Sequence, residues 1–177
     1  MRFQEIGVFG IVVCLALQAF GAELSYKAPK DWLREKPTSS LRKDQFRLPG
    51  PKGSEDATLA IFHFPGTGGD VEANLQRWYF QFRDENGDPI SQPENKEQLK
   101  VNKIPLTYVY LGGTYLESKS PMMMGGPKVE KRNYAMMGAI AETKDGAWFF
   151  KTVGPKKSVD RWKAEFRAFL ETISEKK

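Results

Sequence analysis

The chain has 177 residues, of which 40% are hydrophobic and 12% aromatic, and its 27 basic and 22 acidic residues give a net charge of +5. This composition suits one ordinary domain with a core of its own. The basic residues are scattered among acidic ones, which disfavours a nucleic-acid partner. A single cysteine, Cys14, and a single histidine, His63, exclude a disulfide framework and disfavour an ordinary zinc site.

The first residues predict export. The segment Ile6–Phe20 is nearly all apolar and ends in a small-x-small site, a pattern typical of a secretory signal peptide over residues 1–21. Cleavage before Ala22 would remove Cys14 and leave residues 22–177 as a single periplasmic or extracellular domain. The apolar run is shorter than the roughly 20 residues that span a bilayer. An uncleaved segment that anchors the protein in the membrane is the alternative.

The first half of the domain predicts two strands and a helix. Strands are expected at Ser39–Leu48 and Thr58–Phe64, the second apolar on both faces. A glycine-rich turn then leads to a helix over Val71–Phe82, for which Asp70 is a natural N-cap. The segment Asp84–Gln98 is expected to be a hydrophilic loop.

The second half predicts four strands and a closing helix. The strands are expected on either side of Pro105 and on either side of a hairpin turn, at 100–104, 106–116, 133–142 and 147–153. Gly112-Gly113 indicates a bulge or a close approach of backbones. Glu117–Arg132 is expected to be a long loop. The final helix is expected over Val159–Ser174, with Ser158 as its cap.

This order of elements predicts an α+β fold. Several strands are apolar on both sides, so their sheet has to be covered on both faces. Consecutive strands with short turns favour a mostly antiparallel sheet, with the helices packed on its faces.

Several segments carry a resemblance to a known family. They are the turn Ala28–Trp32, the run Gly68-Gly69-Asp70 with the helix Glu72–Trp78, the strand Phe149–Lys151, and the aromatic residues of the last helix. Together they resemble the PsbP/Mog superfamily, and more narrowly uncharacterised exported bacterial proteins of that fold. The resemblance implies an α/β/α sandwich around an antiparallel sheet. It also implies an accessory or binding role, as in photosystem assembly or the binding of a small GTPase, with no catalytic residues.

Two motifs resemble catalytic or ligand-binding sites. The Gly66–Gly69 turn before a helix resembles a phosphate cradle, but Asp70 would cap the helix and repel phosphate, so a connecting turn is the favoured interpretation. His63 is the only imidazole, and alternation places it on one strand face with Leu59 and Ile61. We therefore interpret it as a half-buried structural histidine, because catalysis requires an acid or a nucleophile beside it.

The hydrophilic run Asp84–Asp88 superficially suggests calcium. Its glycine comes too early for an EF-hand loop, so a solvated turn is expected. The serine-hydrolase motif G-x-S-x-G is missing from the sequence.

Most of the candidate contact residues lie in the segment before the strands expected at 133–142 and 147–153. Met122, Met123 and Met124 suit adaptable contact with a partner, and their thioethers also suit Cu(I). The third interpretation is a loop without a role. Lys128, Lys131 and Arg132, together with Lys156 and Lys157, predict a basic edge that would favour an acidic partner.

The leading hypothesis is a non-enzymatic exported binding or accessory domain without a cofactor. Its expected partner is another envelope protein, and its expected contact with the membrane is limited to an uncleaved signal segment. The alternative is a carrier of a small ligand or copper, with the Met122–Met124 loop and the Gly66–Gly69 turn lining the site. A hydrolase is the third and least favoured hypothesis.

Overall fold

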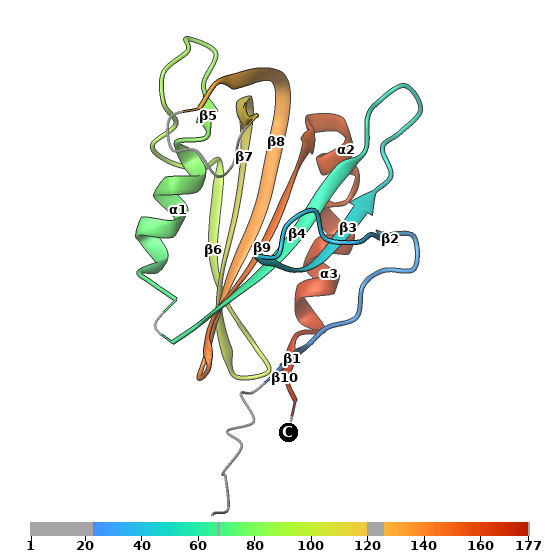
Figure 1. The fold of residues 1–177 in the computed structure, drawn as a ribbon, viewed down its shortest axis with the longest axis vertical. Coiled ribbons are helices and arrows are strands. Elements are labelled where there is room, and N and C mark those ends of the chain that lie inside the picture. Colours follow the sequence, from blue (N-terminus) through green and yellow to red (C-terminus); the bar gives the residue numbers. More distant parts are fainter. Residues whose placement is uncertain (1–22, 67, 120–125, 177) are drawn as a thin grey trace, which may run out of the picture.

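The computed structural model describes residues 23–66, 68–119 and 126–176. Within this part of the chain an antiparallel sheet of eight strands lies between helices, and a pair of two-residue strands joins the ends of the domain (Figure 1). The elements in chain order are β1 (Leu24–Ser25), β2 (Leu33–Arg34), β3 (Arg42–Leu48), β4 (Ala57–Pro65), α1 (Val71–Tyr79), β5 (Phe82–Arg83), β6 (Asn95–Val101), β7 (Ile104–Ser118), β8 (Lys128–Thr143), β9 (Gly146–Pro155), α2 (Lys156–Arg161), α3 (Lys163–Glu171) and β10 (Ser174–Glu175).

The large sheet runs in the order β2-β3-β4-β9-β8-β7-β5, and β6 also pairs with β7. Helix α1 covers one face of this sheet, and α2 and α3 cover the other (Figure 1). The expected α+β class, with helices on both faces of an antiparallel sheet, is therefore confirmed.

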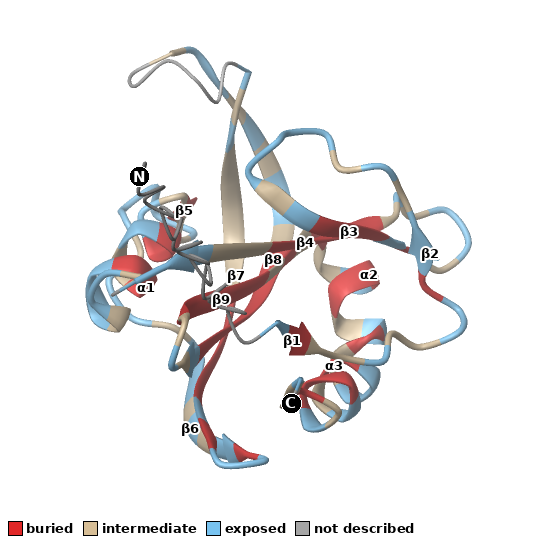
Figure 2. Ribbon diagram, turned by 60° about the horizontal axis from the view of Figure 1, so that its bottom comes forward, coloured by how far each residue is buried: buried red, intermediate tan, exposed pale blue. Residues whose placement is uncertain are grey.

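Two apolar cores follow from this layering. Phe149 of β9 packs in the core under α1, whereas Phe150 points to the opposite face and packs in the core under α2 and α3. Phe150 is fully buried. Successive residues of a strand point to opposite faces, so a strand that is apolar throughout can serve both cores. Figure 2 shows that buried residues gather in the middle of the sheet and on the inner sides of the helices.

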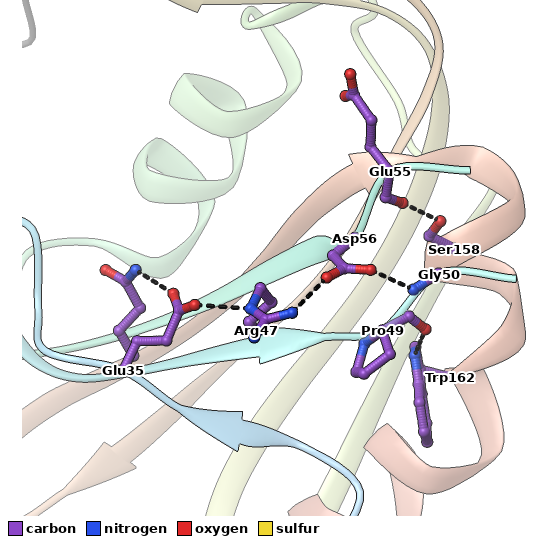
Figure 3. A network of polar contacts seen from close by, with 9 residues as sticks. Glu35, Arg47, Pro49, Gly50, Glu55, Asp56, Ser158 and Trp162 are labelled. Atoms are coloured by element: carbon purple, nitrogen blue, oxygen red, sulfur yellow. Dashed lines mark hydrogen bonds and ion pairs between the residues drawn. The ribbon is translucent and has the colours of Figure 1, made fainter. Parts of the chain in front are cut away.

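A polar network ties the outer strands to the last helices (Figure 3). Arg47 of β3 donates to both Glu35 and Asp56, and Asp56 accepts a hydrogen bond from the Gly50 backbone N–H at 2.7 Å. The indole N–H of Trp162, between α2 and α3, donates to the Pro49 carbonyl oxygen at 2.8 Å. The β3–β4 turn is thereby held against the helices.

The Ser158 hydroxyl donates to the carbonyl oxygen of Glu55 at 2.5 Å (Figure 3). Ser158 is fully buried inside α2, and Pro155 is the N-cap of that helix. The expectation that Ser158 caps the last helix is therefore wrong. The single helix expected there is divided at Trp162 and ends at Glu171, and Ser174 belongs to β10, which pairs with β1.

The expected loop at 84–98 begins where predicted, directly after β5, but it ends too late, because β6 begins at Asn95. β6 is an edge strand whose exposed positions are polar, so its composition is that of a loop. The first helix ends at Tyr79, earlier than expected, because Phe82 joins the sheet.

Pro105 does not separate two strands as expected. β6 and β7 form a hairpin whose turn residues are Asn102 and Lys103, both with positive φ angles of 48° and 74°. Pro105 is the second residue of β7 and lies opposite Lys100. The turn was not expected because it contains no glycine.

The expected loop Glu117–Arg132 is wrong at its two ends. β7 continues to Ser118 and β8 begins at Lys128, and these ends pair with each other. The turn at 144–146, by contrast, joins β8 and β9 as expected. None of the helices in the described ranges is long and apolar enough to cross a membrane.

Candidate functional site

The β7–β8 hairpin extends beyond the strands beside it. β9 ends opposite Tyr134, and β5 pairs with β7 only as far as Tyr115. Residues 116–118 and 128–130 consequently pair with one another and with no further strand of the described sheet. We call residues 114–118 and 128–133 the outer hairpin. Figure 2 shows it projecting from the body of the domain, with mostly exposed or intermediate residues.

A bulge marks the base of the outer hairpin. Gly113 pairs with Tyr134 and Tyr115 pairs with Lys131, so Arg132 and Asn133 both lie opposite Thr114. Asn133 has a φ angle of 55°, the left-handed conformation that asparagine tolerates better than most residues. A bulge bends its strand and increases the local twist, so it redirects the outer hairpin.

Gly112 and Gly113 were expected to mark a bulge or a close approach of backbones, and both features are present. The register shift lies immediately after Gly113. A β-carbon on Gly113 would collide with the carbonyl oxygen of Arg83 on β5. The Gly112 backbone N–H donates to the Glu94 carboxylate at 2.7 Å. The extra residue of the bulge belongs to β8, however, which the sequence did not indicate.

The predicted basic residues of the outer hairpin point to two sides. Lys128 and Arg132 are exposed and, with Glu130 between them, lie on one face of β8 by strand alternation. Lys131 faces the other way, and its Nζ lies 3.9 Å from a carboxylate oxygen of Glu117. Met122, Met123 and Met124 lie outside the described residues.

A groove of about 1050 Å³ lies between the outer hairpin and the connection from β5 to β6. Its charged lining carries both signs: Arg83, Asp84, Glu85, Glu94, Glu130, Arg132 and Lys156. Leu116 is the one large apolar side chain among its lining residues. The groove brings together Arg132 and Lys156 of the predicted basic edge, but not Lys128, Lys131 or Lys157.

Lys156 is held in place by a polar cluster beneath the groove. Its Nζ donates to the Tyr110 hydroxyl at 2.6 Å and to the Asp160 carboxylate at 3.0 Å. The hydrogen bond to Tyr110 is the main reason that the pKa of Lys156 is raised above its ordinary value. Lys163 contacts the same Asp160 carboxylate at 2.9 Å. Lys156 therefore brings a fixed positive charge to the groove.

The glycine-rich turn before α1 has a structural role. The Asp70 carboxylate accepts a hydrogen bond from the Ala73 backbone N–H at 2.8 Å, as predicted for an N-cap. The Asn74 side chain donates to the Asp70 carbonyl oxygen at 2.8 Å. Because the helix end already carries its own carboxylate, it would repel a phosphate.

His63 lies beside a smaller cavity of about 380 Å³. Its ring stacks on Trp148 with centroids 4.4 Å apart, and its Nε2 lies 3.2 Å from the Asp145 carbonyl oxygen. The Asp145 carboxylate is 3.8 Å from the same nitrogen. In the described ranges no three metal-ligating side chains gather at one place. These contacts give His63 a packing role, in keeping with its interpretation as a structural histidine.

The Asp84–Asp88 turn folds on itself. One carboxylate oxygen of Asp84 accepts hydrogen bonds from the backbone N–H groups of Asn86 and Asp88, each at 2.9 Å. This arrangement is a side-chain-stabilised turn, as expected, and its carboxylate is already occupied.

Sequence reasoning missed two cations on the α1 face of the sheet, Lys151 of β9 and Arg42 of β3. The sequence did contain a signal for Lys151, because it is the one charged residue in the largely apolar run Ala147–Val153.

No known family model and no curated protein matches the chain. Its structure is similar to that of PA94 from Pseudomonas aeruginosa, a protein of unknown function described as a candidate regulator. The TM-score is 0.53, the identity is 7%, and 82% of this chain and 98% of that chain are covered. Cyanobacterial PsbP from Synechocystis sp. PCC 6803 also matches, with a TM-score of 0.48, 13% identity and 98% of each chain covered.

A PsbP protein is thus among the structures that this chain matches. The low identities limit both likenesses to the fold. Neither protein is described as an enzyme.

Proposed function

We propose that this protein is a non-enzymatic exported accessory domain that binds another protein of the cell envelope. The outer hairpin and the adjoining groove form the proposed contact surface. The observation that carries the proposal is the extension of β7 and β8 beyond their neighbouring strands, which presents backbone and side chains away from the body of the domain.

The outward-facing charges of β8 support an acidic partner segment there, whereas the groove lining, with four carboxylates and three cations, suits a segment of mixed charge. On the exposed face of β8, Lys128 and Arg132 flank a single carboxylate, that of Glu130. Lys156 adds a fixed positive charge to the groove that Arg132 also lines. Complementary charges at such a surface guide association and set the register between partners.

The lining of the groove favours a protein partner over a small apolar ligand. Pockets for small ligands are lined mostly by apolar and aromatic side chains. This groove carries seven charged side chains and one large apolar side chain, Leu116. A polar, charged segment of another protein suits such a surface better.

The surroundings of His63 support a binding role rather than catalysis. The neighbours of its ring are Trp148 and Asp145, whose backbone carbonyl oxygen lies 3.2 Å and whose carboxylate lies 3.8 Å from Nε2, and no hydroxyl group from the described ranges is hydrogen-bonded to it. A histidine that activates a nucleophile needs that nucleophile within hydrogen-bonding distance.

Site-specific photo-crosslinking in the native host tests the proposal. A photoreactive residue is placed at Lys128, at Arg132 or, as a control, at Lys103 in the β6–β7 turn at the other end of β7. We expect one discrete product of the same mass from positions 128 and 132 and none from 103. The absence of a discrete product at 128 and 132, or the same product from 103, would overturn the proposal.

Binding with purified components then tests the charges. The captured protein should bind the wild type, and the Arg132→Glu variant should weaken this binding at least about tenfold, as expected for loss of a charged contact. The Lys103→Glu variant makes the same change in charge away from the surface and should bind as the wild type does. Equal binding by all three proteins would contradict a contact through the outer hairpin.

A further inference from the structure

Lys151 occupies a site between small residues on the α1 face of the sheet. In the register of the strands it lies between Ala60 of β4 and Gly138 of β8. The Trp78 ring of α1 packs so closely on Gly138 that a β-carbon there would come within 2.5 Å of Cζ3. Small neighbours on both sides leave room for a long side chain between the helix and β4.

The ammonium group of Lys151 lies among groups without negative charge. Its Nζ donates to the side-chain oxygen of Gln81 and lies 5.8 Å from the centroid of the Trp78 ring. An amide oxygen and an aromatic face attract a cation but do not neutralise it.

Arg42, the first residue of β3, is a second cation close by. Its Cζ lies 6.0 Å from the centroid of Phe62, and its Nη1 donates to Gln45 Oε1 at 2.6 Å. Phe62 lies directly opposite Phe149 on β9, two residues before Lys151. The ion pairs found within residues 23–66, 68–119 and 126–176 include neither Lys151 nor Arg42.

The electrostatic cost of this arrangement is visible in both groups. Burial, followed by the positive charge of Arg42, lowers the pKa of Lys151 to about 7. Burial also lowers the pKa of Arg42. Two neighbouring cations that are partly removed from water and have no carboxylate partner destabilise a fold. A bound anion would relieve this cost.

Neither residue is fully removed from solvent. Lys151 and Arg42 each keep an intermediate part of their surface in contact with solvent. Each has N–H groups beyond the ones bonded to Gln81 and Gln45. The neighbouring apolar surface includes Phe62 and the exposed Phe64, whose rings are stacked 6.5 Å apart.

We propose that Lys151 and Arg42 bind the carboxylate of a small organic ligand, whose apolar part lies against Phe62 and Trp78. The two cations supply charge-assisted hydrogen bonds to the carboxylate oxygens, and the aromatic rings remove the apolar part from water. This site is separate from the outer hairpin and does not depend on the proposed protein partner.

Titration with benzoate tests the site. Sodium benzoate is added to the protein at constant ionic strength, and the NMR signals of the Lys151 backbone amide, the Gln81 side-chain amide and the Trp78 indole are followed. We expect saturable shifts with benzoate. Benzyl alcohol has the same ring without the charge, so it should cause much smaller shifts.

Variants identify the groups responsible. Lys151→Met keeps the chain length and removes a buried charge, so the fold should be retained, and benzoate should bind at least about tenfold more weakly. Arg42→Gln should weaken binding in the same direction. Lys157→Met removes a lysine outside the site and should leave the affinity unchanged.

Three results would overturn the proposal. Equal affinity of the wild type and Lys151→Met for benzoate would show that the ammonium group is not part of the site. NMR shifts with benzyl alcohol as large as those with benzoate would show that the ligand binds through apolar contact alone. Binding of inorganic phosphate as tightly as benzoate would remove the role of the aromatic surface and with it the assignment to an organic carboxylate.

Discussion

The ring of Trp78 in α1 packs directly against the backbone of Gly138 in β8. A β-carbon at position 138 would come within 2.5 Å of Cζ3 and 3.0 Å of Cε3 of that ring. The contact fixes how closely α1 approaches the sheet, and Trp78 is almost fully buried by it. The helix also carries the ring that lies over Lys151, so this contact shapes the proposed carboxylate site as well.

Gly138→Ala should therefore destabilise the protein. The added methyl group forces Trp78 and α1 away from the sheet, and overpacking of this kind costs about 1–3 kcal/mol. Urea unfolding followed by tryptophan fluorescence measures the change. Gly112→Ala is the control, because its β-carbon would meet the mobile end of Glu94 at 3.0 Å, and a smaller loss is expected. Equal losses in the two variants would contradict this account.

Trp162→Ala should cost about 3–5 kcal/mol, the range for removal of a large core aromatic residue. Trp162 is 4% exposed, and its ring lies edge-on to Trp32 at 6.4 Å between centroids. Trp162→Phe keeps most of the packing and loses the hydrogen bond to the Pro49 carbonyl, so it should cost less. A loss well under about 1 kcal/mol for the alanine variant would mean that α2 and α3 are not docked on the sheet as described.

Asp70→Ala should destabilise the protein by about 1 kcal/mol, because it removes the side chain that accepts the Ala73 N–H at the start of α1. Asp70→Ser keeps an accepting oxygen and should retain most of the stability. Chemical unfolding of the two variants measures the difference. An alanine variant as stable as the wild type would show that the cap contributes nothing to stability.

The stability of the protein should rise with pH above neutrality through Lys151. Burial and then the charge of Arg42 lower its pKa from 10.5 to about 7 in the folded chain. Between these values the unfolded chain binds a proton that the folded chain lacks, so raising the pH favours folding, by at most about 1.4 kcal/mol per pH unit. The loss of stability caused by burying the charged Lys151 ammonium is complete below pH 7, and it disappears as the pH approaches 10.5.

Urea unfolding of the wild type and of Lys151→Met across this pH range, without added carboxylate, measures the effect. The unfolding free energy of the wild type should increase relative to that of Lys151→Met as the pH rises. A difference that does not vary with pH would show that Lys151 titrates as an ordinary lysine in the folded chain.

The local patterns of the sequence predicted much of the fold. Thr58–Phe64 and Ala147–Val153 are apolar on both faces, and they form β4 and β9 in the middle of a covered sheet. Asp70 caps α1 as expected, and the pair Gly112-Gly113 lies where backbones approach closely. These features are local, because each depends on the chemistry of a few consecutive residues.

The outer hairpin was not predicted, because its strands are polar and receive their hydrogen bonds from each other. Glu117–Arg132 has the composition of a loop, and only the pairing of β7 with β8 makes strands of its two ends. The bulge depends likewise on Asn133, whose positive φ follows from the register between two strands rather than from its neighbours in sequence.

The sequence by itself determined the class of fold, the two apolar faces of its sheet and the caps and turns of its first helix, since periodicity and turn chemistry are local properties. The tertiary structure alone decided which distant residues meet. It placed Arg132 and Lys156 on one groove, and it brought Lys151 and Arg42 together without a carboxylate. Such meetings depend on strand order and register, which couple residues far apart in the chain and leave no periodic signal within it.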